Sequence, residues 1–221
     1  HAAQFVQVET WGNGEMPETT TVGAAVGGAY QAQGYLSPIR IMPEAEAGHL
    51  AEKITEIYND HGTEAKGLLG SNAHHIFPDL FDLVCNPAIV DRVEEVLGPD
   101  ILCWSAGFFS KPPHDPSFVS WHQDLTYWGL EPADIITAWV ALTPSTPESG
   151  CMRVVPGSHH QGQLGHGDTY VAENLLSRGQ VLDVAVDEDE AVDLVLQPGE
   201  MSLHHVLIVH GSEFNRSDLP R

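Results

Sequence analysis

The spacing of hydrophobic residues along the chain changes near Gly98. Before it, apolar residues recur at steps of three and four along residues 43–60, directly after Pro43, which predicts an amphipathic helix. A second helical stretch is predicted from Pro78. It includes NPAIVDRVEEVLG, in which Asn86 suits the N-cap and Gly98 the stop.

After Gly98 the hydrophobic stretches are short, rich in β-branched and aromatic residues, and separated by clusters of Gly, Pro and Ser. Seven short strands following two helices predict a mostly-β domain, a barrel or jelly roll, with the N-terminal helices packed on one side. The predicted strands are residues 101–109, 118–128, 135–142, 151–155, 181–186, 192–197 and 201–210.

Residues 1–30 are rich in Gly, Ala and Thr and lack sustained periodicity. They are expected to form an N-terminal extension or mobile arm. Residues 33–40, QGYLSPIR, are predicted to be the first strand of the domain, which we place at residues 31–221.

Charge and cysteine content narrow the kinds of partner and the cellular compartment that suit this chain. The 221 residues include 9 Lys and Arg against 31 Asp and Glu, a net charge of −22, which opposes binding to nucleic acid or anionic membranes. A small molecule is the expected partner, and charge complementarity favours a cationic or zwitterionic one. The sequence predicts no oligomeric state. Cys85, Cys103 and Cys151 have no CxxC spacing and are expected to be buried thiols in a reducing cytoplasm.

The stretch SWHQDLTYW, residues 120–128, carries the first candidate chemistry. Side chains two positions apart in a strand share a face, so His122 and Asp124 are predicted to lie side by side. A buried His–Asp hydrogen bond and half of a metal site both fit this pair. Thr126 has the same alternation and is expected to face the same pocket, whereas Tyr127 and Trp128 fit either the rim of a substrate cavity or plain packing.

The predicted strand 201–210 supplies a second histidine, His210, just before Gly211 and Ser212. Two histidines and one carboxylate form the facial triad that suits non-haem Fe(II), because three ligands on one face leave three positions for cosubstrate and O2. His204 shares the alternation of His210, and we expect it to be either a hydrogen-bonded histidine of the barrel or a residue that supports the ligands, rather than a ligand itself.

Arg221 lies eleven residues after His210, and Ser212 adds a hydroxyl nearby. A planar guanidinium is the preferred bidentate partner of a carboxylate. A dicarboxylate cosubstrate held by iron at one end would therefore find its far end here. A surface ion pair is the alternative for Arg221.

These motifs together resemble the phytanoyl-CoA dioxygenase family of Fe(II)/2-oxoglutarate oxygenases. The resemblance covers roughly residues 33–221 and rests on the HxD pair, the later His, and the Ser and Arg two and eleven residues beyond it. Further matching motifs, in the family's order and spacing, are FFSKPP, WHQD, AWVAL, GCMRVVPGSH, PGE and HGSEFN.

The resemblance implies a double-stranded β-helix (jelly roll) and a hydroxylase that uses Fe(II), 2-oxoglutarate and O2, with ascorbate as an activator in vitro. It implies hydroxylation of an aliphatic C–H of a small-molecule metabolite, with release of succinate and CO2. The implied residues are His122, Asp124 and His210 for iron, Arg221 and Ser212 for the far carboxylate of 2-oxoglutarate, and Trp139 and Lys66 for the cosubstrate pocket.

Two departures from the family affect these expectations. Family members continue beyond this arginine into a last strand, so either the present sequence stops short of that strand or the strand is missing here, and an arginine at a free end would be poorly held. Related halogenases replace the carboxylate of the triad with a small residue, so Asp124 favours hydroxylation over halogenation. Two other functions stay open: a non-catalytic jelly roll that binds metal and 2-oxoglutarate, and a zinc hydrolase with the same three ligands.

Overall fold

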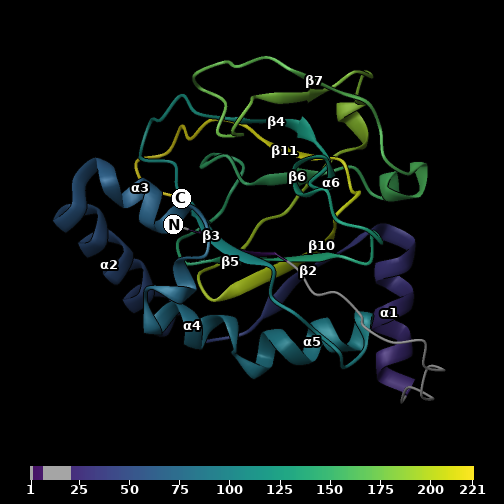
Figure 1. Ribbon diagram of the computed structural model, residues 1–221, viewed down its shortest axis with the longest axis horizontal. Helices are drawn as coiled ribbons and strands as arrows, with labels where there is room; N and C mark the ends of the chain where they lie inside the picture. The colour runs from purple at the N-terminus through teal and green to yellow at the C-terminus, as the bar shows by residue number, and fades with distance from the viewer. Residues whose placement is uncertain (1, 7–20) are drawn as a thin grey trace.

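The computed structural model describes residues 2–6 and 21–221. Two β-sheets face each other in a jelly roll, and helices cover the outer face of the larger sheet (Figure 1). This arrangement confirms the predicted mostly-β fold with helices packed on one side.

The larger sheet has five strands in the order β2-β10-β5-β1-β3, and each of its pairings is antiparallel. Its strands are β1 (Ala2–Val6), β2 (Tyr35–Arg40), β3 (Ser105–Phe109), β5 (Ile136–Ala141) and β10 (Glu200–His205).

The smaller sheet has four strands in the order β4-β11-β6-β9, and a separate antiparallel pair, β7-β8, lies beside it. These strands are β4 (Val119–His122), β6 (Met152–Val154), β7 (His166–Asp168), β8 (Gln180–Leu182), β9 (Val192–Asp193) and β11 (His210–Ser212).

Most of the helical residues precede β3, and a single short turn of helix follows β4. The Asn86 side chain accepts a hydrogen bond from the backbone N–H of Ala88 at 2.9 Å, as an N-cap does, and Gly98 ends the same helix at φ 89°. The helices are α1 (Thr21–Gln33), α2 (Glu44–His61), α3 (Ala65–Gly70), α4 (Pro78–Val84), α5 (Pro87–Leu97) and α6 (Leu125–Trp128), with 3₁₀ turns at Gly62–Glu64, Ala73–His75, Ser158–Gln161 and Glu188–Glu190.

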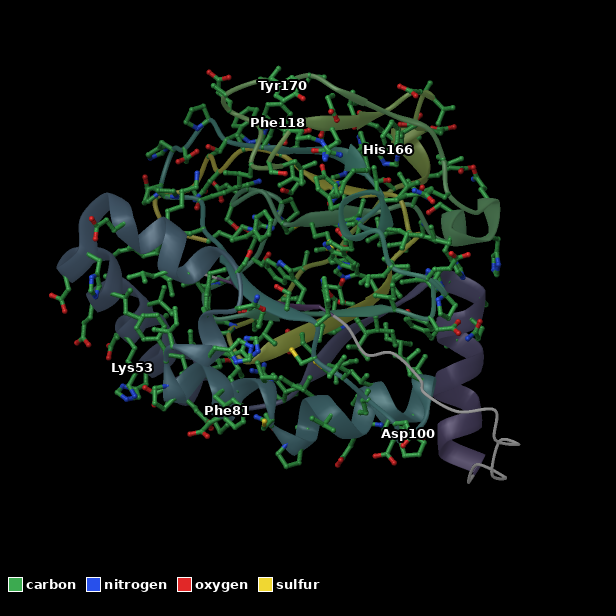
Figure 2. All side chains as sticks on the ribbon, in the orientation of Figure 1. Lys53, Phe81, Asp100, Phe118, His166 and Tyr170 are labelled. Carbon is green, nitrogen blue, oxygen red and sulfur yellow. The ribbon has the colours of Figure 1, made fainter. Side chains whose placement is uncertain are left out.

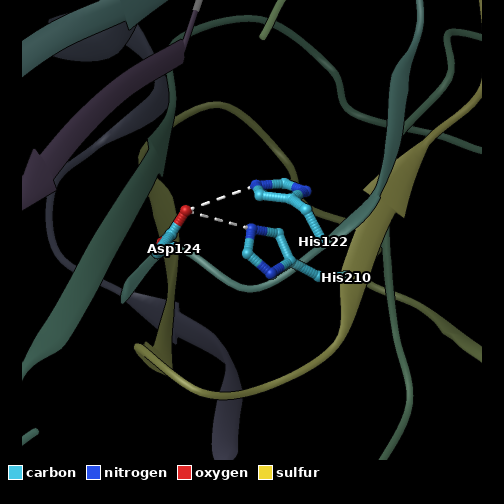
Figure 3. A group of neighbouring side chains, drawn as sticks. All are labelled: His122, Asp124 and His210. Atoms are coloured by element: carbon cyan, nitrogen blue, oxygen red, sulfur yellow. Dashed lines mark ion pairs between the residues drawn. The ribbon is translucent and has the colours of Figure 1, made fainter. Parts of the chain in front are cut away.

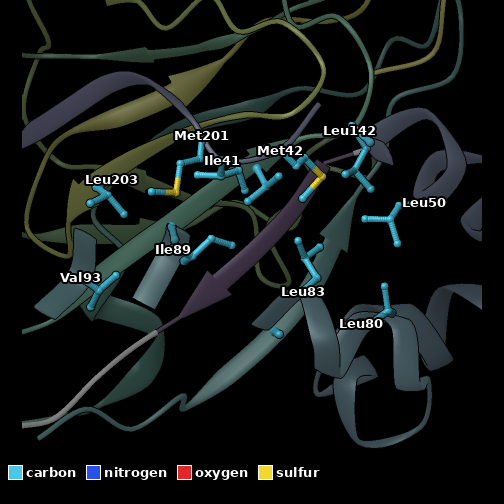
Figure 4. Close-up of a cluster of buried hydrophobic side chains, with 14 of the residues drawn as sticks. Ile41, Met42, Leu50, Leu80, Leu83, Ile89, Val93, Leu142, Met201 and Leu203 are labelled. Carbon is cyan, nitrogen blue, oxygen red and sulfur yellow. The ribbon is translucent and has the colours of Figure 1, made fainter. Parts of the chain in front are cut away.

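Strand β5 separates two hydrophobic clusters because its side chains alternate between the two faces of the sheet. Ile136, Ala138 and Val140 pack in the cluster under the helices, which Figure 4 shows from inside the molecule. Trp139 and Ala141 belong to the cluster between the two sheets. The face that carries Trp139 therefore looks toward the smaller sheet, where His122 and His210 lie.

The structure differs from the sequence-based prediction in several places; the helical stretch predicted from Pro78, for example, is divided into α4 and α5. Residues 118–128 do not form one strand, because β4 ends at His122 and the chain turns into α6. Residues 201–210 are likewise divided, since the chain crosses from β10 in the larger sheet to β11 in the smaller one. Two stretches of the predicted extension are ordered, as β1 and α1, while residue 1 and residues 7–20 of the predicted arm lie outside the described residues.

Close packing of β3 against the end of α3 gives a testable prediction. A Cβ added to Gly107 would overlap the backbone carbonyl of Gly70, whereas a Cβ added to Gly70 would meet nothing within 4 Å. We expect Gly107→Ala to lower the free energy of unfolding by about 1–3 kcal/mol, because the backbone must move to relieve the overlap. Gly70→Ala is the matched control and is expected to be neutral or stabilising in urea unfolding; equal stability of the two variants would contradict this packing.

Candidate metal centre and cosubstrate pocket

Two histidines from distant parts of the chain meet across one strand pair. His122 is the last residue of β4 and His210 the first of β11, and the two are direct partners in the antiparallel ladder. Their ring centroids lie 4.1 Å apart. Residues opposite each other in such a ladder have neighbouring side chains, so the sheet register itself brings the two imidazoles together.

Asp124 completes the cluster from the first turn of α6, where its backbone is helical at φ −60° and ψ −36°. Its carboxylate faces both imidazoles (Figure 3). Oδ1 lies 3.3 Å from Nε2 of His122 and 3.6 Å from Nε2 of His210. His122 and Asp124 are therefore side by side as predicted, but the turn after β4, and not strand alternation, is the reason.

The hydrogen bonds of the two rings fix which nitrogen can bind a cation. His122 Nδ1 lies 2.9 Å from the carbonyl oxygen of Ser120, and His210 Nδ1 lies 3.0 Å from that of Ile208. A carbonyl only accepts, so each Nδ1 donates its proton and each Nε2 presents a lone pair toward Asp124 Oδ1. These lone pairs repel the carboxylate unless a cation lies between them, and this donor set suits a divalent transition metal.

Burial and mutual contacts keep the cluster in the protonation state that a metal requires. Burial, together with the neighbouring His122, lowers the pKa of His210 to about 3, which keeps its imidazole neutral near pH 7. Burial alone would raise the pKa of Asp124, but the surrounding His210, His122 and His204 hold that pKa well below its usual value. The centre thus contains an ionised carboxylate at Asp124 and a neutral imidazole at His210.

The second oxygen of Asp124 is held by the larger sheet. Thr137 in β5 donates its hydroxyl to Oδ2 at 3.1 Å, and Nε2 of His204 in β10 lies 3.6 Å from the same oxygen. Thr137 was not predicted, although it lies on the same face of β5 as Trp139, which was. His204 is fully buried next to Asp124, which fits one of its two expected roles, that of a residue supporting the ligands; neither of its ring nitrogens has a hydrogen-bond partner among the described residues.

The predicted carboxylate-binding residues gather beside the metal cluster. Arg221 is buried, with only 4% of its surface exposed, and its guanidinium carbon lies 5.1 Å from the centroid of the Trp139 ring. Burial lowers the pKa of Arg221 to about 10, so it stays charged near pH 7. The expectation of a poorly held arginine is wrong, because the backbone N–H of Arg221 donates to the carbonyl of Lys111 at 3.0 Å and its carbonyl accepts from the N–H of Lys111 at 2.7 Å.

A cavity of about 520 Å³ joins these groups. The metal cluster and the residues around Arg221 open into the same space, and Tyr127 and Trp128 line it as the rim prediction expected. Tyr127 also packs edge-on against the His122 ring, with centroids 5.7 Å apart. The lining includes Ser71, Asn72, Trp104, Phe109, His122, Asp124, Tyr127, Trp128, Trp139, Leu175, Leu176, Ser177, His210, Ser212 and Arg221.

Two predicted site residues lie away from this cavity. Thr126 does not line it, and its hydroxyl is paired with Nδ1 of His166 at 3.1 Å. Strand alternation no longer applies there, because β4 ends at His122 and Thr126 belongs to α6. Lys66 is exposed on α3 and is also absent from the lining.

Gln123, between the two predicted ligands, is a structural residue that the sequence did not reveal. It is fully buried, and its amide donates to the carbonyls of Leu207 at 2.7 Å and Gly162 at 2.9 Å while accepting from the N–H of Leu164 at 2.7 Å. These bonds tie the turn after β4 to the segments before β11 and β7. The side chain between His122 and Asp124 thus fixes the turn that aims both of them.

Comparison with known proteins agrees with this geometry. The phytanoyl-CoA dioxygenase (PhyH) family matches residues 30–221. A probable alpha-ketoglutarate-dependent hypophosphite dioxygenase of Stutzerimonas stutzeri is 32% identical over 152 residues, which cover 68% of this chain and 52% of that protein. The peroxisomal phytanoyl-CoA dioxygenase of Homo sapiens is 32% identical over 144 residues, 63% of this chain and 42% of that protein. The chain therefore spans about half the length of the curated relatives it matches.

Solved structures show the same fold. The apo form of the non-heme monooxygenase ThoJ superimposes with a TM-score of 0.78 at 32% identity, covering 89% of this chain and 74% of that one. EvdO2 from Micromonospora carbonacea var. aurantiaca, complexed with 2-oxoglutarate, has a TM-score of 0.69 at 22% identity over 93% of this chain and 90% of that one, a likeness of fold alone. With its family match over residues 30–221, the chain belongs to the phytanoyl-CoA dioxygenase family.

Proposed function

We propose that the protein is an Fe(II)- and 2-oxoglutarate-dependent dioxygenase that hydroxylates an aliphatic C–H of a small-molecule metabolite. The observation that carries this proposal is the opening of the His122–Asp124–His210 cluster into the same cavity as Arg221 and Ser212. Family membership supports it, as do the activities that the names of its relatives state.

In this proposal His122, Asp124 and His210 hold the iron through ligand atoms that lie within 4.8 Å of one another. When bound, iron and 2-oxoglutarate supply the oxidising chemistry, in which one atom of O2 enters the product hydroxyl, the other enters succinate, and CO2 leaves. The protein's own part is to fix the ligands. Thr137 holds the rear oxygen of Asp124, and two backbone carbonyls hold the imidazole tautomers.

Arg221 and Ser212 are proposed to bind the far carboxylate of 2-oxoglutarate beside the ring of Trp139. No ion pair engages Arg221 among the described residues, and its Nε is buried without a hydrogen-bond partner. A buried, unpaired guanidinium is costly, and an incoming carboxylate would satisfy it. Lys66 and Thr126 are not part of the proposed binding site, because neither lines the cavity.

The charges around the cavity favour a substrate without phosphate groups. Apart from Arg221 and the three proposed iron ligands, the lining residues in the described part of the chain are uncharged. The sequence has only 9 Lys and Arg residues. One of them, Lys53, lies on the helical layer, far from His166 in β7 on the other side of the molecule (Figure 2). Five of these cations already pair with a carboxylate: Arg40 with Glu200, Lys53 with Asp79, Arg92 with Glu95, Arg153 with Glu188 and Arg178 with Asp168.

Binding coenzyme A would require a cluster of free cations for its phosphates, which this distribution does not offer. We therefore propose a small neutral, cationic or zwitterionic metabolite, with Tyr127 and Trp128 as contacts at the rim of the cavity. The net charge of −22 makes nucleic acid an unsuitable partner for this chain.

No helix in the described part of the chain is long and apolar enough to cross a bilayer. A cytoplasmic location remains our proposal, and free thiols at Cys85, Cys103 and Cys151 support it, although only Cys151 is buried as expected, since Cys103 is half-buried and Cys85 exposed.

The test is a metabolite screen with Fe(II), 2-oxoglutarate and ascorbate that follows succinate release, with mass spectrometry for a gain of one oxygen. We expect a small cationic or zwitterionic compound to stimulate succinate release and to be hydroxylated, and a straight-chain acyl-CoA to do neither. Binding of 2-oxoglutarate without turnover across the panel would favour a non-catalytic binding module. Oxygen-independent hydrolysis with zinc bound would favour a zinc hydrolase.

A further inference from the structure

A lysine that the proposed chemistry does not yet use is buried behind the carboxylate-binding end of the cavity. Lys111 follows β3 and has none of its surface exposed. Its backbone pairs with that of Arg221 through two hydrogen bonds, of 2.7 and 3.0 Å. The two cationic residues are therefore held as neighbours by the main chain, at the same end of the cavity.

The ammonium of Lys111 contacts only neutral oxygens. Nζ donates to the hydroxyl of Ser212 at 2.7 Å, to the carbonyl of Ser212 at 3.4 Å and, over a shorter distance, to the carbonyl of Glu213. Three acceptors match the three protons of an ammonium group. Within the described residues no carboxylate comes within ion-pair distance of Lys111 or Arg221, although the more distant Glu213 and Asp115 act on Lys111, so two buried basic groups share one region without a directly bound counter-ion.

A second positive charge on Lys111, buried beside Arg221, is unfavourable unless an anion joins the two residues. Burial, with the added effect of Arg221, lowers the pKa of Lys111 to about 6, because the charged lysine has no anionic partner in contact with it. An anion bound beside Arg221 would favour the charged form of Lys111. The site is thus incomplete without a negatively charged group.

Lys111 reaches that group through Ser212. Ser212 lines the cavity and Lys111 does not. Because the Ser212 oxygen accepts from Nζ, its own proton is free to turn toward the cavity. A serine hydroxyl alone could donate or accept, whereas a serine held by an ammonium is set to donate.

We propose that Lys111 is a positioning residue for the cosubstrate. It orients the Ser212 hydroxyl to donate to the far carboxylate of 2-oxoglutarate, and with Arg221 it supplies a second positive charge at that end. The inference rests on the proposed function, since it assigns a residue to the cosubstrate of that site. Lys111 takes the part that the sequence resemblance had suggested for Lys66.

The experiment compares two ligands on one protein. 2-Oxopentanoate has the length of 2-oxoglutarate but a methyl group in place of the far carboxylate. Both are titrated anaerobically into the Fe(II)-loaded protein and followed by the visible charge-transfer absorbance of the 2-oxo acid on iron. In Lys111→Met, which keeps the length of the side chain without its charge, we expect about tenfold weaker binding of 2-oxoglutarate and unchanged binding of 2-oxopentanoate.

The ratio of the two affinities separates positioning from a general structural role. Equal weakening of both ligands, or no change in either, would overturn the proposal. Should Lys111→Met fail to fold, Ser212→Ala answers the same question, since it leaves the bonds from Nζ to the carbonyls of Ser212 and Glu213 in place. That variant must lose affinity for 2-oxoglutarate alone, and unchanged discrimination overturns the proposal. Wild-type protein that binds iron but not 2-oxoglutarate would instead refute the proposed function, and this inference with it.

Discussion

Replacing Asp124 with alanine is expected to abolish succinate release and to weaken iron binding by more than ~100-fold, which exceeds the loss typical of residues behind metal ligands. The carboxylate is the anionic member of the cluster, and its Oδ1 faces both Nε2 atoms at 3.3 and 3.6 Å. Without it, two neutral imidazoles remain, which cannot hold the three positions of a facial triad. Iron affinity is measured by anaerobic titration, and turnover by succinate release.

Asp91→Ala is the matched control, because Asp91 is an exposed aspartate on α5, in the helical layer. It is expected to retain iron affinity and turnover. Circular dichroism of both variants checks that the fold survives. Iron binding by Asp124→Ala at the wild-type level would remove Asp124 from the centre and leave the buried hydrogen-bond cluster as its role.

The sequence predicted which three residues the structure brings together, but it misjudged the backbone that presents them. His122 and Asp124 were expected to share a strand, yet β4 ends at His122 and Asp124 comes from a turn of helix. Hydrophobic alternation cannot reveal this break, because the polar residue at the turn, Gln123, is itself fully buried. Its three hydrogen bonds to distant backbone segments decide the local conformation.

A similar limit applies to the last predicted strand. Residues 201–210 are mostly apolar, so periodicity reads them as one buried strand. The chain instead leaves β10 at His205 and re-enters the other sheet at His210. His204 and His210 consequently approach Asp124 from opposite sheets, although the sequence had suggested that they share one face.

Capping residues at helix ends predicted the secondary structure more reliably than composition did. The Asn86 cap and the Gly98 stop predicted the bounds of α5 closely, because both act through local backbone geometry. Helix α1 carries no such signal, and its Gly- and Ala-rich sequence suggested an extension. The role of Lys111 was equally hidden, since a lysine is exposed by default and only the tertiary structure buries this one.

Replacing Arg221 with glutamine is expected to weaken 2-oxoglutarate binding by at least roughly 30-fold, the loss that follows removal of one partner from a buried charge pair. The unliganded variant should be no less stable than the wild type, because the guanidinium lies buried without a carboxylate partner among the described residues. Its backbone bonds to Lys111 do not depend on the side chain. Arg221→Lys keeps the charge but loses the planar fork, so an intermediate affinity is expected. Anaerobic titration measures the affinities, and thermal unfolding measures the stabilities. Wild-type affinity in Arg221→Gln would show that the far carboxylate binds elsewhere. A large loss of stability would instead indicate that the arginine serves the fold.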